Sequence, residues 1–191
     1  MAASITRKTP VALIGLGGVG ASVLSQLLSP ALSSKFNLIL IANSRSSLSL
    51  PLPNSSPEFS LTTENWKPLL EQHGKPLDIP SIISLLSTHP EGPCIFIDST
   101  GSSTIPELYP TILQMNVNLV TPNKKGFSSS QSLYDQIQNS SYPKTTALVY
   151  GESTVGAGLP ILSTLKDLVG TGDEINKVEG VFSGTLSYIF N

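Results

Sequence analysis

The stretch VALIGLGGVGASVL, residues 11–24, predicts the fold of the N-terminal part of this chain. An apolar run of strand length leads into a glycine-rich turn, and a helical pattern of apolar residues follows. The glycines give the spacing G-x-G-x-x-G, which allows a tight turn, close approach to a diphosphate, and packing of the helix on the strand. We therefore expect a dinucleotide site rather than a glycine-rich turn without a ligand. The expected contacts are Gly15, Gly17, Gly18, Val19 and Gly20.

Short apolar runs alternate along the chain with segments of helical period, which is typical of a parallel sheet with crossover helices. The runs are apolar on both faces, as expected for strands that helices cover on both sides. The expected strands are 11–14, 38–42, 95–98, 118–120 and 147–149. The expected helices are 18–28, 64–72, 79–87, 105–115 and 130–137. Residues 1–150 are therefore predicted to form an α/β domain, a Rossmann-like doubly wound parallel sheet.

The segment 45–63, RSSLSLPLPNSSPEFSLTT, is rich in Ser and Pro and has no clear period. We interpret it as a long surface connection and assign it no function.

From residue 151 the pattern changes, and residues 151–191 are expected to begin a second α+β domain that is incomplete. Pro160 fits the first turn of a helix, and Gly170 suits its C-terminal cap. The expected buried stripe of this helix is Ile161, Leu165, Leu168 and Val169. The segment KVEGVF, 177–182, resembles a strand, and SGTLSYIF, 183–190, resembles the start of another helix.

The composition favours a small-molecule partner. The 191 residues include eleven Lys plus Arg and thirteen Asp plus Glu, which gives a net charge of −2. With no basic run, we expect neither nucleic acid nor a membrane surface as a partner. The single cysteine, Cys94, lies in the apolar run CIFI and is interpreted as a buried structural thiol in a reducing, cytoplasmic compartment.

The end of the second expected strand reads ANSR, residues 42–45, where the adenosine ribose of a bound dinucleotide would lie. An Asp or Glu there would favour NAD, and neither is present. Asn43 and Ser44 can hydrogen-bond the ribose, and Arg45 offers a fork for a 2′-phosphate. The stretch favours NADP, with NAD possible; the alternative is that Arg45 faces only solvent.

Two polar stretches follow later strands. In FIDSTGSS, 96–103, Ser99 and Thr100 are candidates for contacts with the nicotinamide side of the cofactor, although an ordinary exit from a strand would look the same. In TPNKKGF, 121–127, two lysines lie just beyond a strand end, where ligands bind in open parallel sheets. Locally, the lysines fit either a solvated loop or a cation delivered to bound chemistry.

These motifs together resemble one family. The segments GLGGVG (15–20), DSTGSS (98–103), TPNKKGFSS (121–129), YGESTVGAGLP (150–160) and VEGVFSGTLSYIFN (178–191) closely resemble homoserine dehydrogenase, particularly its fungal form. The likeness runs in order through nearly the whole chain.

The resemblance implies NAD(P)-dependent interconversion of L-homoserine and L-aspartate 4-semialdehyde, a step towards threonine, methionine and isoleucine. It implies a homodimer with a dinucleotide-binding domain, a dimerisation region and a substrate domain. In this family Lys124 would be the catalytic lysine close to nicotinamide and substrate, whereas Lys125 is expected to face solvent. An ammonium there would stabilise negative charge on the carbonyl oxygen or donate a proton.

The resemblance also implies a monovalent cation, sodium, held by Glu152 and by the backbone carbonyls of Val155, Ala157 and Leu159. It places Gly184 and Thr185 near the substrate. The family's proton-transferring lysine and its partner aspartate would follow residue 191. The alternatives are a dinucleotide-binding module without catalysis, and another semialdehyde or amino-acid dehydrogenase with a similar nucleotide domain.

Overall fold

The computed structural model describes residues 7–52, 61–181, 183 and 189, and the described residues build one mixed sheet with helices on both faces. The sheet has seven strands in the order β4-β3-β2-β1-β5-β6-β7. Their bounds are β1 Thr9–Ile14, β2 Phe36–Ala42, β3 Ser46–Ser49, β4 Lys75–Pro76, β5 Ile95–Asp98, β6 Asn118–Val120 and β7 Val149–Tyr150.

The five strands from β2 to β7 are parallel, and the chain changes direction across the sheet at β1. After β1 it builds β2 on one side, and it later returns to build β5 on the other side. Loops at the carboxyl ends of β1 and β5 therefore diverge, which creates the crevice where open α/β sheets bind ligands. The predicted Rossmann-like α/β fold is confirmed.

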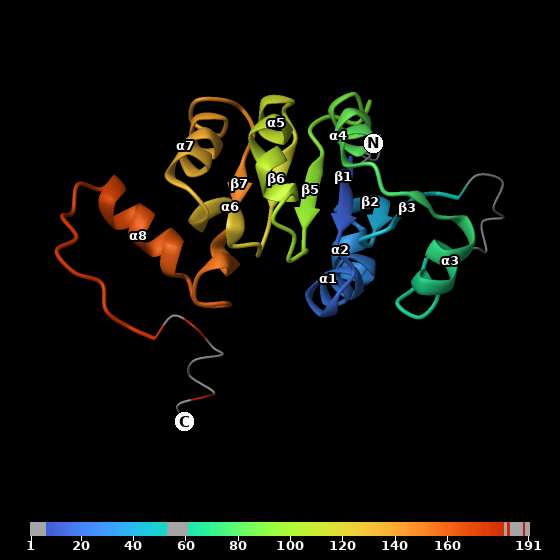
Figure 1. Cartoon of the computed structure of the whole chain (residues 1–191), viewed down its shortest axis with the longest axis horizontal. Helices are drawn as coiled ribbons and strands as arrows, with labels where there is room; N and C mark the ends of the chain where they lie inside the picture. The colour runs from blue at the N-terminus through green and yellow to red at the C-terminus, as the bar shows by residue number, and fades with distance from the viewer. Residues whose placement is uncertain (1–6, 53–60, 182, 184–188, 190–191) are drawn as a thin grey trace, which may run out of the picture.

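Helices cover both faces of this sheet (Figure 1). Helices α4, α5 and α7 pack on one face with the larger core, and α1 and α3 contribute to the core on the other face. The bounds are α1 Gly18–Leu28, α2 Pro30–Ser33, α3 Trp66–His73, α4 Ile79–Ser87, η1 Ile105–Leu108, α5 Tyr109–Gln114, α6 Lys125–Ser128, α7 Gln131–Asn139, η2 Glu152–Thr154 and α8 Ile161–Gly170. None of the helices in the described ranges combines the length and the apolar character that crossing a membrane requires.

Part of the predicted surface connection is wrong, because Ser46–Ser49 is strand β3 and pairs antiparallel with β2. Asn43 makes the turn between them. Its side-chain oxygen accepts from the Arg45 and Ser46 N–H groups, each at 2.8 Å, and its own N–H donates to the Ser46 carbonyl oxygen at 2.9 Å. Such a local Asn turn reverses the chain without the glycine that usually signals a hairpin. Residues 53–60 of the predicted connection lie outside the described residues.

Helix α8 begins where predicted, but its predicted buried stripe is wrong. No α8 residue is buried, and Val169 is 60% exposed. The residue that ends the helix in the left-handed conformation is Gly172, at φ 91°, and not Gly170. In Figure 1, α8 lies at the end of the molecule beyond β7, so the sheet cannot cover its apolar face.

Of the two elements predicted after α8, the strand is wrong over residues 177–181, and the helix stays a prediction. Residues 177–181 are exposed and outside any strand, and none of the described strands pairs with them. Most of the helix predicted for 183–190 lies outside the described residues.

Gly20 sets how closely α1 packs on β1. A Cβ atom at residue 20 would lie 1.9 Å from the Gly15 carbonyl oxygen, and Gly15 itself has φ 93°. Both positions therefore exclude other residues for steric reasons, one by contact and the other by backbone conformation.

Gly20→Ala should lower the free energy of unfolding by about 1–3 kcal/mol, because the added methyl group forces α1 away from β1. Gly18→Ala is the matched control, since a Cβ atom at residue 18 meets nothing within 4 Å. Alanine there should be neutral or raise stability by up to about 1 kcal/mol. Urea unfolding of the three proteins measures both effects, and equal midpoints for the two variants would contradict the steric argument.

Candidate functional site

The glycine loop, residues 15–18, lies at the carboxyl end of β1 and is fixed on both sides. The Gly15 N–H donates to the Ala42 carbonyl oxygen at the end of β2, at 2.8 Å. On the other side, the Ser99 N–H donates to the Ile14 carbonyl oxygen, also at 2.8 Å. A Cβ atom at residue 15 would lie 2.8 Å from the Thr100 nitrogen. The loop is therefore held between the carboxyl ends of β2 and β5, the two neighbours of β1.

The outer surface of this loop is open. Gly17, Gly18 and Val19 are exposed, and a Cβ atom at either glycine would meet nothing within 4 Å. No side chain caps the N-terminus of α1. Free amide groups and the positive end of the helix dipole favour an anionic group such as a diphosphate at this position.

Ser99 adds a polar group beside the loop. Its side-chain oxygen is buried and has no hydrogen-bond partner among the described residues. The Ser99 Cβ lies 3.5 Å from the position that a Cβ of Gly20 would take. The open glycine loop, the uncapped N-terminus of α1 and this unpartnered hydroxyl beside them fit a dinucleotide.

The predicted adenosine contacts lie at the turn between β2 and β3. The Asn43 side-chain oxygen is engaged in that turn, so only its amide nitrogen is free to donate to a ribose. Ser44 and Arg45 are exposed at the tip of the turn. Within the described ranges no acidic side chain forms an ion pair with Arg45. Its guanidinium is therefore free to pair with a phosphate.

A buried carboxylate, for which the sequence predicted no role, joins the loops that follow β5 and β6. Asp98 is fully buried and accepts three hydrogen bonds, from the Thr100 N–H at 2.8 Å, the Tyr109 hydroxyl at 2.5 Å and the Asn123 side-chain amide at 3.1 Å. The Thr121 hydroxyl donates to the Asp98 backbone carbonyl at 2.8 Å. We call Asp98, Tyr109, Thr121 and Asn123 the Asp98 cluster. An Asp that ends an apolar strand was the available signal for it.

Tyr109 remains a hydrogen-bond donor in this cluster. Burial raises the pKa of its hydroxyl far above the ordinary value, and the neighbouring charge of Asp98 raises it further. The hydroxyl therefore stays protonated at physiological pH and keeps its bond to the carboxylate.

The two lysines of the loop after β6 have different surroundings. Lys125 is exposed, as predicted, and its ammonium also donates to the Gly101 carbonyl oxygen at 2.8 Å, a contact that the sequence did not predict. The sheet order explains the contact, because β6 lies next to β5 and brings the two exits together. Lys124 is exposed, and its ammonium has no hydrogen bond or ion pair within the described part of the chain. Lys124 is thus the lysine that is free to reach a bound molecule.

The predicted cation ligands lie on the loop before α8. Both Glu152 carboxylate oxygens accept backbone N–H groups of α8, from Leu162 and Ser163, each at 2.9 Å. The Leu159 carbonyl accepts from the Ile161 N–H at 2.9 Å. Glu152 therefore caps α8, and the predicted ligands are partly engaged in protein contacts. Oxygen atoms that accept one hydrogen bond each keep a second lone pair for a cation.

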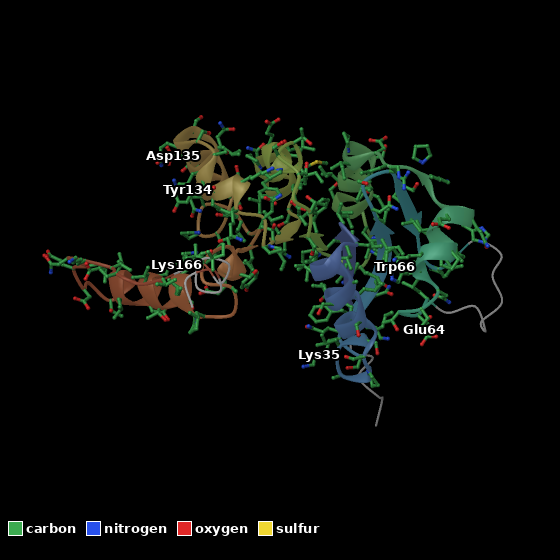
Figure 2. All side chains as sticks on the ribbon, turned by 60° about the horizontal axis from the view of Figure 1, so that its bottom comes forward. Lys35, Glu64, Trp66, Tyr134, Asp135 and Lys166 are labelled. Carbon is green, nitrogen blue, oxygen red and sulfur yellow. The ribbon has the colours of Figure 1, made fainter. Side chains whose placement is uncertain are left out.

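The two other predicted ligands, Ala157 and Val155, differ in their surroundings. Ala157 is exposed and has φ 53°, whereas Val155 lines a cavity of about 590 Å³ together with Glu152. Tyr134 and Lys166 also line this cavity, at the opposite end of the molecule from Trp66 (Figure 2). In the described part of the chain no three His, Cys, Asp or Glu side chains form a metal-binding group. The predicted substrate contacts Gly184 and Thr185 lie outside the described residues.

Comparison with known proteins agrees with this geometry. The sequence model of the homoserine dehydrogenase NAD-binding domain matches residues 15–149, and a second homoserine dehydrogenase model matches residues 160–191. Homoserine dehydrogenase of Emericella nidulans is 46% identical over 184 residues, which cover 94% of this chain and 48% of that protein. The Saccharomyces cerevisiae enzyme is 40% identical over 97% of this chain and 50% of its own length. The chain spans about half the length of these relatives.

Solved structures show the same fold. A Candida auris protein of unknown function superimposes with a TM-score of 0.78 at 34% identity, over 96% of this chain and 49% of that one. A hyperthermophilic archaeal homoserine dehydrogenase in complex with NADPH gives a TM-score of 0.60 at 20% identity, over 85% of this chain and 50% of its own, and it supports the fold alone. The NAD-binding model matches residues 15–149, which are most of this chain. This chain therefore belongs to the homoserine dehydrogenase family.

Proposed function

We propose that this chain binds a nicotinamide dinucleotide across the carboxyl ends of its parallel strands and forms the coenzyme-binding part of a homoserine dehydrogenase. The open glycine loop carries the proposal, because it is fixed between the ends of β2 and β5 and presents uncapped amides. The reaction would interconvert L-homoserine and L-aspartate 4-semialdehyde with NADP or NAD, in threonine, methionine and isoleucine biosynthesis.

The amides at Gly17, Gly18 and Val19 would hold the diphosphate, and Arg45 would pair with a 2′-phosphate at the adenosine end. Ser99 and Thr100 follow β5, the neighbour of β1, and would contact the nicotinamide end. When bound, the coenzyme supplies or accepts the hydride, and the protein supplies orientation and charge.

Lys124 would act on the substrate oxygen. When the semialdehyde is reduced, negative charge grows on its carbonyl oxygen, and a nearby ammonium stabilises that charge. In the reverse direction the same ammonium would stabilise the alkoxide of homoserine. Lys124 is favoured over Lys125 for this role because the Lys125 ammonium is already hydrogen-bonded to Gly101, whereas the Lys124 ammonium has no partner among the described residues.

One observation favours a second candidate, a dinucleotide-binding module without catalysis. The glycine loop, the Arg45 turn and the two lysines all lie within residues 15–149, the part that the NAD-binding domain model matches. We further propose that residues 151–191 begin a dimerisation and substrate domain, that the complete protein is a homodimer, and that it works in the cytoplasm. Gel filtration would contradict the dimer if the complete protein eluted as a monomer, and cell fractionation would test the compartment.

Mixing the protein with L-homoserine and NADP at alkaline pH should produce the absorbance of NADPH. Lys124→Ala should lower kcat by about 10²–10³-fold, the usual effect of removing a group that stabilises an oxyanion. It should leave NADPH binding within about twofold if its role is confined to the substrate oxygen. Saturable NADPH binding without homoserine oxidation would support the second candidate, and no saturable binding would contradict both. Lys35→Ala, an exposed lysine beside the amino end of β2, is the matched control.

Arg45→Ala should weaken NADPH binding by about tenfold, the equivalent of ~1.4 kcal/mol, because a charge-assisted contact with the 2′-phosphate is lost. NADH lacks that phosphate, so its affinity should change little. Fluorescence titrations with both coenzymes measure the difference, again with Lys35→Ala as control. Equal losses for NADPH and NADH would remove the case for NADP preference.

We also propose that Glu152 and the carbonyls of Val155, Ala157 and Leu159 take sodium, an ion that oxygen ligands suit. Sodium at about ten times its Kd would add ~1.4 kcal/mol of stability, which raises Tm by roughly 3–6 °C. Thermal melts in NaCl should therefore exceed those in choline chloride of equal ionic strength. Glu152→Gln should reduce this difference, whatever it does to the capping of α8. Identical melts of the unmodified protein in both salts would contradict the site.

A further inference from the structure

We propose that Lys125 is a positioning residue that latches the loop after β5 to the loop after β6, so that both form one rigid wall at the nicotinamide end of the site. The inference rests on the proposed coenzyme binding. It concerns residues 99–104, here called the β5 loop, and residues 121–125, the β6 loop.

The inner attachment between these loops is the side-chain amide of Asn123, which is 5% exposed. Its nitrogen donates to the Asp98 carboxylate at 3.1 Å and to the Ser102 carbonyl oxygen at 2.9 Å. Its oxygen accepts from the Lys125 N–H at 3.1 Å. One buried amide therefore ties the β5 loop, the β6 loop and the start of α6 together.

The outer attachment, here called the latch, is the hydrogen bond that the Lys125 ammonium donates to the Gly101 carbonyl oxygen, at 2.8 Å. A Cβ atom at Gly101 would meet nothing within 4 Å, so the tip of the β5 loop has open space around it. A charge-assisted hydrogen bond is stronger than a neutral one, and here it joins residues 24 positions apart. The latch thus holds an exposed point of the β5 loop that has open space around it.

The residues on both sides of Lys124 are fixed by this arrangement. Asn123 and Lys125 are hydrogen-bonded to the β5 loop, and Gly126 packs under Tyr109, where a Cβ atom would lie 2.6 Å from the ring. In the described structure Lys124 alone in the turn 123–126 carries a polar side chain without a partner. A free reactive group on a fixed backbone is the arrangement that a functional site requires.

Loss of the latch should loosen the nicotinamide end and leave the adenosine end intact. Arg45 lies in the turn after β2, and the glycine loop follows β1; Lys125 hydrogen-bonds to neither of them. Ser99 and Thr100 flank the glycine loop and are fixed by bonds to Ile14 and Asp98, whereas Lys125 contacts the β5 loop further along, at Gly101. A ligand that occupies only the adenosine end should therefore bind as before.

The test compares Lys125→Met and Lys125→Arg with Lys124→Met, which removes the same charge from the neighbouring residue. NADPH probes the whole site, and adenosine 2′,5′-bisphosphate probes the adenosine end. Lys125→Met should weaken NADPH binding about 5–10-fold, as expected for one charge-assisted hydrogen bond, and change bisphosphate binding less than about twofold. Lys125→Arg keeps a donor and should bind NADPH nearly as the unmodified protein does.

Amide hydrogen exchange without ligand gives a second measurement. Residues 99–104 should exchange faster in Lys125→Met than in Lys124→Met. If both methionine variants lose the same NADPH affinity, the loss is due to the removed charge and not to the latch. If amide exchange of residues 99–104 is unchanged in Lys125→Met, the latch does not hold the β5 loop. Either result overturns the proposal while coenzyme binding stands. If the unmodified protein binds neither NADPH nor NADH, the proposed function itself fails, and faster exchange would then support only the link between the loops.

Discussion

The contact between Gly20 and the Gly15 carbonyl oxygen is the constraint on which the rest of the structure depends. It lets α1 lie directly against the carboxyl end of β1, with room for no side chain between them. The N-terminus of α1 consequently opens into the crevice at the carboxyl ends of β1 and β5. Had the helix been displaced by a methyl group, its free amides and dipole would no longer point from a fixed loop toward an anion.

The two ends of the proposed coenzyme site are built differently. At the adenosine end, a short turn stabilised by the Asn43 carboxamide exposes Arg45. The fold tolerates substitution of exposed side chains of this kind. At the nicotinamide end, a carboxylate is buried, which is unfavourable unless hydrogen bonds compensate. Asp98 obtains three such bonds, from its own loop, from α5 and from the β6 loop. The bonds that make its burial tolerable also fix the geometry where the chemistry is proposed to occur.

The errors of the sequence analysis share a physical origin. Strand β3 was missed because its serines give no strand pattern, and pairing with β2 stabilises it nonetheless. The α8 stripe was predicted to be buried because it has helical periodicity, but periodicity shows only which residues share a face and not whether anything covers it. Lys125 is exposed as predicted, but its bond to Gly101 was not predicted, because a backbone carbonyl as partner leaves no trace in the amino-acid sequence.

Local features were therefore readable from the residues alone. The glycine spacing, β5, β6, α1 and α4 were all predicted with the bounds that the structure has, because backbone sterics and the alternation of apolar runs act between near neighbours. The Asp98 cluster and the Lys125 latch were not predictable in this way. Their partners are up to 25 positions apart in the sequence. They meet because β6 pairs with β5, so that the carboxyl ends of the two strands lie side by side. Strand order is a property of the whole fold, and so are the contacts that hold Lys124 in place.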